Sequence, residues 1–159
     1  MQKIAIIIPT RNNKDNLFKT LDTLQKSTNH PNYDIFIITD NQGELSNETF
    51  WKLSNDDKIT LLISRTKGSI KAMNFGIKKT WDEDILLTHD DMIFEKTDPD
   101  WLTYIQWLAY SQEDIGVITY RGAVGRSGSD YLDGLNWVGT WFMFIPRKTI
   151  NKIGILDDS

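Results

Sequence analysis

Four short apolar runs, each followed at once by polar residues, constrain the fold of this chain more than any other feature. They cover residues 4–8, 34–39, 59–64 and 84–88. The first is continuous and mostly β-branched, which is typical of a strand that is buried on both faces of a sheet. We therefore expect each run to form a strand.

The segments between these runs have the spacing of amphipathic helices. Apolar residues recur at intervals of three and four over residues 15–26 and 69–79, which places them on one helical face. Asp98 and Pro99 open a third helical pattern, with Asp98 as the expected N-cap and Pro99 in the first turn. The polar residues 41–49 are expected to form a loop or the start of a short helix.

Two further strands are expected over residues 115–120 and 141–145, on either side of a glycine-rich loop at residues 122–134. Alternating strands and helices predict an α/β fold, with a mostly parallel, doubly wound sheet and helices on both faces. The 159 residues contain no internal repeat and no linker, so we expect one domain over residues 1–159.

Composition excludes several functional classes. The net charge is −4 and no dense basic cluster occurs, which argues against a nucleic-acid partner. The chain has no cysteine, which removes disulfides and thiol chemistry and suits a reducing compartment. No apolar stretch reaches the length of a membrane span, and the first apolar segment is too short for a signal peptide. We expect a cytoplasmic protein without a membrane span.

Polar clusters follow the first four strands directly, at residues 10–12, 40–41, 65–67 and 89–91. Ligands of doubly wound sheets bind beyond the carboxyl ends of the strands. All four clusters should therefore meet at one edge of the sheet.

Asp90 and Asp91 are the sharpest feature of this edge. Adjacent carboxylates at the end of a buried strand repel each other unless a cation compensates. Their oxygens suit Mg²⁺ or Mn²⁺, which bind through one or two carboxylates and substrate phosphate. The alternative is a solvated turn. His89 is a third metal ligand, a donor to phosphate or, as we slightly favour, a partly exposed packing residue.

Other polar residues of the same edge also have two interpretations. Asp40 either accepts a hydrogen bond from a base or ribose, or caps the next segment. Arg65 and Lys67 either neutralise a diphosphate or are solvated loop cations. Asn74 and Gly76 are poor helix formers, which indicates a close backbone approach or a ligand contact.

Several familiar motifs are absent. Gly122, Gly125 and Gly128 do not form a dinucleotide-binding fingerprint, and no phosphate-binding Gly-Lys-Ser/Thr loop occurs. These glycines instead indicate a mobile loop, for which closure over substrate is one use. With two histidines, no Ser-His-Asp arrangement can be read. A nucleotidyltransferase, which uses a related sheet and metal-bound carboxylates, is a less favoured alternative. It normally has a glycine-rich basic loop after the first strand, whereas residues 9–13 contain no glycine.

In these segments the chain resembles the family 2 glycosyltransferases, whose fold is called GT-A. The similar segments follow the family's order and lie at residues 6–12, 37–41, 67–76, 86–91, 139–143 and 153–158. The resemblance implies transfer of a sugar from a nucleoside diphosphate sugar, with UDP as the expected nucleotide, to a saccharide or other hydroxyl acceptor. It also implies inversion at the anomeric carbon and a Mn²⁺ or Mg²⁺ cofactor.

The resemblance also implies roles for individual residues. Asp91 is the expected metal ligand, with Asp90 as a second ligand or a contact to ribose or diphosphate. The expected nucleotide-binding residues are Pro9, Thr10, Arg11, Asn12, Asp40, Lys67, Asn74 and Asp90. The chain departs from the family pattern at His89, which replaces the first acid of the metal-binding motif.

The C-terminal end departs more seriously. Related enzymes carry their catalytic acid several residues beyond the equivalent of Asp157 and Asp158, and helices follow. We expect a truncated chain, with a nucleotide-binding half over residues 1–95 and an acceptor-side half over residues 96–159. The alternatives are a binding domain without turnover, or Asp158 or Asp157 acting as the general base.

The tryptophans have ordinary explanations as well as functional ones. Trp101 and Trp107 are expected to pack a helix against the core. Trp137 and Trp141 lie beside the glycine-rich loop and are either acceptor contacts or, more commonly, buried aromatic residues.

Overall fold

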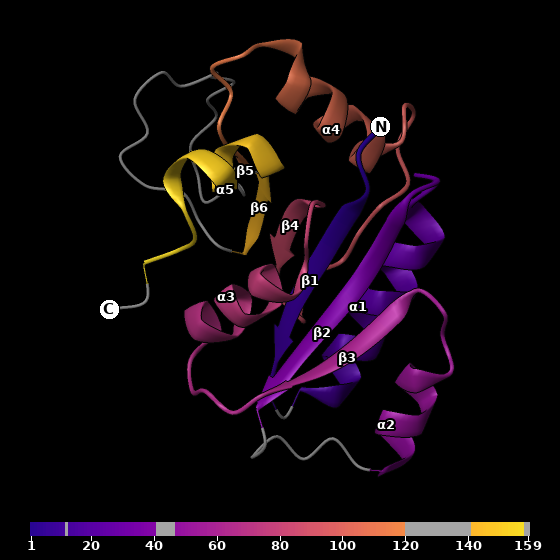
Figure 1. Cartoon of the computed structure of the whole chain (residues 1–159). Coiled ribbons are helices and arrows are strands. Elements are labelled where there is room, and N and C mark those ends of the chain that lie inside the picture. Colours follow the sequence, from indigo (N-terminus) through magenta and orange to yellow (C-terminus); the bar gives the residue numbers. More distant parts are fainter. Residues whose placement is uncertain (12, 41–46, 120–140, 158–159) are drawn as a thin grey trace, which may run out of the picture.

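The computed structural model of the chain describes residues 1–11, 13–40, 47–119 and 141–157. Six strands form one sheet in the spatial order β3-β2-β1-β4-β6-β5 (Figure 1). The strands are β1 (Ile4–Thr10), β2 (Tyr33–Asp40), β3 (Ile59–Ser64), β4 (Asp84–Thr88), β5 (Ile118–Thr119) and β6 (Phe142–Ile145).

Strands β3, β2, β1 and β4 are parallel, β6 is antiparallel to β4, and β5 is antiparallel to β6. This arrangement confirms the predicted α/β fold with a mostly parallel sheet. Of the strand predicted over residues 115–120, the structure describes residues 115–119, of which Ile118 and Thr119 form β5. The predicted loop at residues 122–134 lies outside the described part of the chain.

In the part of the chain that the structure describes, five helices cover the two faces of the sheet. They are α1 (Lys14–Ser27), α2 (Asn47–Ser54), α3 (Ser69–Lys79), α4 (Trp101–Ser111) and α5 (Arg147–Ile153). Two clusters of buried apolar side chains lie on the two faces of the sheet. One cluster contains residues of α1, α2 and α4, and the other contains residues of α3 and α5 (Figure 1). Among the described residues, no helix has both the length and the apolar character that a bilayer crossing requires.

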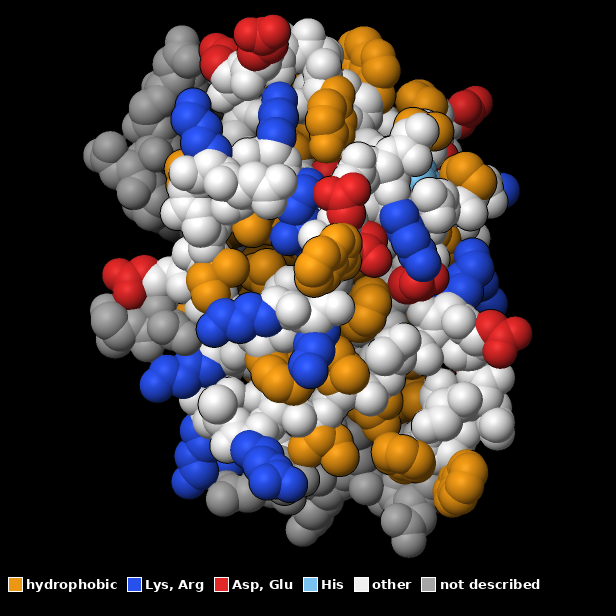
Figure 2. Space-filling view, viewed as in Figure 1, with side chains coloured by type: hydrophobic (Ala, Val, Ile, Leu, Met, Phe, Trp, Pro, Cys, Tyr) orange, Lys and Arg blue, Asp and Glu red, His pale blue; other side chains and the backbone are white. Residues whose placement is uncertain are grey.

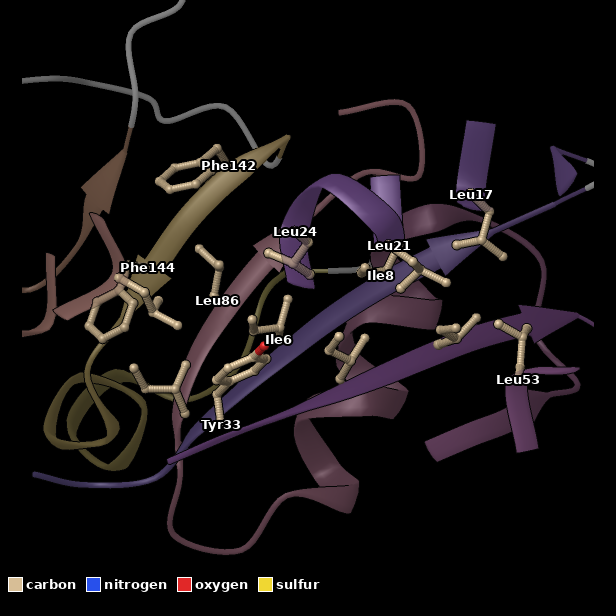
Figure 3. Packing of buried hydrophobic residues seen from close by; sticks show 14 of the residues in the cluster. Ile6, Ile8, Leu17, Leu21, Leu24, Tyr33, Leu53, Leu86, Phe142 and Phe144 are labelled. Carbon is tan, nitrogen blue, oxygen red and sulfur yellow. The ribbon is translucent and has the colours of Figure 1, made fainter. Parts of the chain in front are cut away.

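The continuous apolar pattern of β1 follows from burial on both faces. Ile6 and Ile8 point toward α1, where Figure 3 shows them beside Leu21 and Leu24. Ile7 belongs to the opposite cluster, which contains the apolar residues of α3. All five residues from 4 to 8 are fully buried, as their mostly β-branched sequence predicts.

Helix α4 begins two residues later than predicted. Its N-cap is Asp100, whose carboxylate accepts hydrogen bonds from the backbone nitrogen of Thr103 at 2.9 Å and from its hydroxyl at 2.8 Å. Asp98 was therefore the wrong N-cap. An N-cap side chain accepts from an amide two or three residues ahead of it. Asp100 lies three residues before Thr103, whereas Asp98 lies five residues before it.

The tryptophans of α4 differ from each other. Trp101 is half-buried and stacks on Phe94, with 5.1 Å between ring centroids. Trp107 is 61% exposed, so its predicted packing role was wrong. The buried residues of α4 are instead Leu102, Gln106 and Ala109.

Gly76 permits α3 to approach the sheet closely, as its sequence context indicated. A Cβ atom added there would lie 2.7 Å from Cγ2 of Ile7. We expect Gly76→Ala to lower the free energy of unfolding by about 1–3 kcal/mol through overpacking, measured by urea denaturation. Gly116→Ala is the control, because its added Cβ would meet atoms of Thr149 at ordinary contact distances of 3.7 Å and beyond. Equal stability of both variants would contradict the steric explanation.

Candidate functional site

A cleft of about 470 Å³ lies at the carboxyl ends of the parallel strands. Each of the four polar clusters predicted to meet there contributes at least one lining residue, so the predicted convergence is confirmed. The lining residues are Pro9, Thr10, Arg11, Asn13, Ile38, Asp40, Thr66, Gly68, Ser69, Ala72, His89 and Asp90.

Asp90 joins the end of β4 to the end of β1 within this cleft. One carboxylate oxygen accepts a hydrogen bond from the hydroxyl of Thr10 at 2.6 Å, and the other accepts one from the side-chain amide of Asn13 at 3.0 Å. Asn13 occupies the N-cap position of α1, yet its side chain makes no capping hydrogen bond. Its amide is used to orient Asp90, which leaves one acceptor position on each Asp90 oxygen for a ligand.

Asp40 ends β2 at the other side of β1. Its side chain is largely buried, and the Nε atom of Arg11 lies 3.6 Å from one of its carboxylate oxygens. At that separation the pair is an ion pair rather than a hydrogen bond. The cleft thus contains two carboxylates, of Asp40 and Asp90, and the guanidinium of Arg11.

The N-terminus of α3 opens into the cleft at Gly68. Gly68 is the N-cap residue, with a φ of 106° and no side chain that could cap the helix. That backbone conformation favours glycine. The next residues, Ser69 and Ala72, also line the cleft, and the first turn contains no acid. Free amides at a helix N-terminus attract anions.

Cations lie close to this helix end. Figure 2 shows Lys and Arg side chains gathered over α3 and the loop before it. Lys67 belongs to this loop and is exposed, between the cleft residues Thr66 and Gly68, but does not itself line the cleft.

Asn74 has a structural contact instead of the predicted cleft position. Its side-chain nitrogen donates to the backbone oxygen of Leu156 at 2.8 Å, and its side-chain oxygen accepts from the backbone nitrogen of Leu156 at 3.0 Å. The side chain is buried and absent from the cleft lining. Asn74 therefore ties the C-terminal segment to α3.

The other predicted site residues that the structure describes do not line the cleft. Asp91 is exposed and does not line the cleft, although it follows Asp90 directly. Asp157 is exposed and also absent from the lining. Asn12 and Asp158 fall outside the described residues, as does Trp137. Of the tryptophans beside the glycine-rich loop, Trp141 is partly buried against the core.

Sequence reasoning missed several cleft residues. Asn13 had a visible signal, since it is the last polar residue before α1. Gly68 had one as well, because glycine before a helical pattern indicates an unusual backbone conformation. Ile38 and Ala72 had none, because apolar residues that line a cleft are indistinguishable in sequence from those of the core.

The acidic residues suit a divalent cation that is completed by substrate. In the described chain no three His, Cys, Asp or Glu residues form a metal-binding group. Mg²⁺ and Mn²⁺ sites in phosphate-binding proteins need only one or two carboxylates, since water and phosphate supply the other ligands. The unused acceptor positions of Asp90 and the exposed carboxylate of Asp91 fit this requirement.

The chain has the GT-A fold of nucleotide-diphospho-sugar transferases. A mannosyltransferase from Pyrobaculum calidifontis, solved with GDP-Man and Mn2+, superposes with a TM-score of 0.73 over 98% of this chain and 48% of that chain, at 15% identity. TarS from S. aureus, solved with UDP-GlcNAc, superposes with a TM-score of 0.60 over 80% of this chain and 37% of that chain, at 20% identity.

The sequence profile of Glycosyl transferase family 2 matches residues 5–155, and the chain therefore belongs to this family. A curated relative from Rickettsia bellii (strain RML369-C), described as an uncharacterized glycosyltransferase, is 28% identical over 93 residues. That match covers 58% of this chain and 13% of the relative. The chain thus spans less than half the length of these proteins.

Proposed function

We propose that this chain provides the donor site of a metal-dependent glycosyltransferase that moves a sugar from a nucleoside diphosphate sugar to an acceptor hydroxyl, with inversion. The observation that carries the proposal is the single cleft in which Asp40, Asp90 and the open N-terminus of α3 meet. Membership of Glycosyl transferase family 2 supports the same reaction class.

The strand order suggests how the donor lies in the cleft. Asp40 ends β2 and Asp90 follows β4, with β1 between the two strands. Neighbouring strands are about 4.8 Å apart, so these carboxylates belong to positions separated by about 10 Å across the sheet. If the base binds at Asp40, the attached ribose and diphosphate extend toward Asp90 and the backbone amides at the N-terminus of α3. We propose a UDP-sugar as the donor.

Asp91 and Asp90 would hold Mn²⁺ or Mg²⁺ at the diphosphate. A cation there supplies compensation for the charge that grows on the leaving diphosphate. The chain itself contributes the bonds from Thr10 and Asn13, which fix the Asp90 carboxylate, and the α3 amides, which attract phosphate oxygens. Arg11 balances the negative charge of Asp40.

The acceptor hydroxyl needs a general base that removes its proton as the sugar bond forms. Asp158 is our first proposal for this base and Asp157 the second. Asp157 is exposed and does not line the cleft, which favours an alternative in which this chain binds a nucleotide sugar without turnover. A coupled assay for nucleotide release separates the two, since only a transferase releases nucleotide from its donor.

Calorimetric titration tests the binding proposal that both alternatives share. We expect UDP to bind more tightly in the presence of Mn²⁺ than in the presence of a chelator, because a cation relieves repulsion between the diphosphate and Asp90. GDP serves as the comparison nucleotide. No heat of binding with either nucleotide, with or without Mn²⁺, would reject the donor site.

A further inference from the structure

Strand β3 forms one edge of the sheet, and in the described part of the chain it pairs only with β2 (Figure 1). An edge strand presents unpaired backbone groups, and proteins usually protect such an edge with charged residues, proline or a bulge. The residues of β3 include no charged residue and no proline, and the register with β2 is continuous. This edge therefore lacks the features that normally prevent pairing with another strand.

The register with β2 identifies the backbone groups that face outward. The backbone nitrogen of Ile35 donates to the backbone oxygen of Lys58 at 2.8 Å, and Ile35 is the register partner of Ile59. In a parallel pair each residue bonds to the residues that flank its partner, so alternate residues of a strand face its neighbour. Since Lys58 faces β2, the amide and carbonyl groups of Leu61 and Ile63 face away from it. No backbone hydrogen bond from the described residues reaches these groups.

The side chains of this edge are also open to a partner. Ile63 is 48% exposed, and Thr60 is exposed on the opposite face of the strand. Residues two apart in a strand share a face, so Ile63 lies on the same face as Leu61, which is partly buried against the core. A neighbouring strand would cover the exposed part of both apolar side chains.

The charges that flank β3 have opposite signs at its two ends. The turn before the strand carries Asp57, and the loop after it carries Arg65 and Lys67, all of them exposed. Asp56 and Lys58, in the same turn, already make side-chain contacts within the chain. Two antiparallel copies of this segment bring the acidic end of each toward the basic end of the other. Opposite charges in such cross-strand positions attract, whereas a parallel pair would bring like charges together.

We propose that β3 pairs in antiparallel orientation with β3 of a second copy of this chain, so that the two sheets continue across a two-fold axis. Leu61 and Ile63 of one copy exchange backbone hydrogen bonds with Ile63 and Leu61 of the other, and the two Leu62 residues meet at the axis. The amide of Ile59 already donates to the backbone oxygen of Asp56 at 2.9 Å, which excludes it from the pairing. The proposal is independent of the donor site.

Sedimentation equilibrium from about 10 µM to 1 mM tests this pairing, because an interface built on one strand is small and should dissociate on dilution. We expect the average mass to rise with concentration from 18.4 kDa toward twice that value. Ile63→Lys should weaken the dimer about tenfold, because it removes an apolar contact and places a charge on the edge. Ile153→Lys is the matched control, since Ile153 is 73% exposed on α5 and its substitution should leave dimerisation unchanged.

Charge reversal tests the direction of the two strands. Asp57→Lys and Lys67→Asp should each weaken the dimer about threefold, because each places like charges together at both ends of the interface. The double variant restores opposite charges and should recover the affinity of the wild type. A monomer at every concentration, or equal effects of Ile63→Lys and Ile153→Lys, would overturn the pairing. Failure of the double variant to recover would overturn the antiparallel arrangement.

Discussion

Asp91→Ala should lose the metal-dependent part of nucleotide affinity, with a decrease of about 100-fold in the presence of Mn²⁺, or about 2.7 kcal/mol. The side chain is exposed and the described structure gives it no role in packing, so the fold should be unaffected. The loss arises because one carboxylate alone neutralises and positions the cation less well beside the diphosphate. Titration of UDP with and without Mn²⁺ measures the difference.

Asp22→Ala is the charge-matched control for this substitution. Asp22 is an exposed acid of α1 that pairs with Lys26 at 2.8 Å, and it lines no part of the cleft. Its removal changes the net charge equally but should leave Mn²⁺-dependent affinity unchanged. If both variants lose affinity to the same extent, the effect is one of overall charge, and the assignment of Asp91 as a ligand is wrong.

Asp84→Ala should destabilise the fold more than any other single substitution proposed for this chain, by about 3–5 kcal/mol. The Asp84 side chain is fully buried at the start of β4. It accepts hydrogen bonds from the side-chain nitrogen of Gln106 at 2.8 Å, the hydroxyl of Tyr110 at 2.7 Å and the backbone nitrogen of Arg147 at 2.9 Å. Alanine would leave these donors without their acceptor.

Urea denaturation measures this loss, and Tyr110→Phe provides the comparison. That variant removes one donor and keeps the carboxylate bonded to the other two, so it should cost only about 1 kcal/mol. Equal stabilities of Asp84→Ala and Tyr110→Phe would show that the carboxylate does not join α4 and α5 to β4.

Tyr110 also links stability to pH. Burial, followed by its hydrogen bond to Asp84 and the negative charge of that carboxylate, raises the pKa of Tyr110 above its ordinary value of 10. The unfolded chain therefore releases this proton near pH 10 while the folded chain retains it, so stability falls as the pH rises above 10. Unfolding curves at several alkaline pH values should show a shallower decline for Tyr110→Phe, and parallel declines would contradict the linkage.

The sequence predicted the position of the site better than its internal contacts. The carboxyl ends of parallel strands meet at one sheet edge, so Thr10, Asp40 and His89 could be placed together from their strands alone. Gly76 was also recognisable, because glycine inside an otherwise regular helix indicates a close approach.

Contacts between distant segments could not be predicted in this way. The Thr10–Asp90 hydrogen bond joins residues 80 positions apart, and the Asn74–Leu156 pair spans 82 positions. Their formation depends on how far each strand extends and on side-chain rotamers, and neither leaves a periodic pattern. Asn74 therefore looked like a ligand contact, although its amide is used within the protein.

The most direct measurement is the anomalous scattering of manganese in crystals grown with Mn²⁺ and UDP. We expect a manganese peak within coordination distance of an Asp91 or Asp90 carboxylate oxygen and of the diphosphate, with the base near Asp40. UDP bound in the cleft without manganese beside these carboxylates would contradict the proposed metal site.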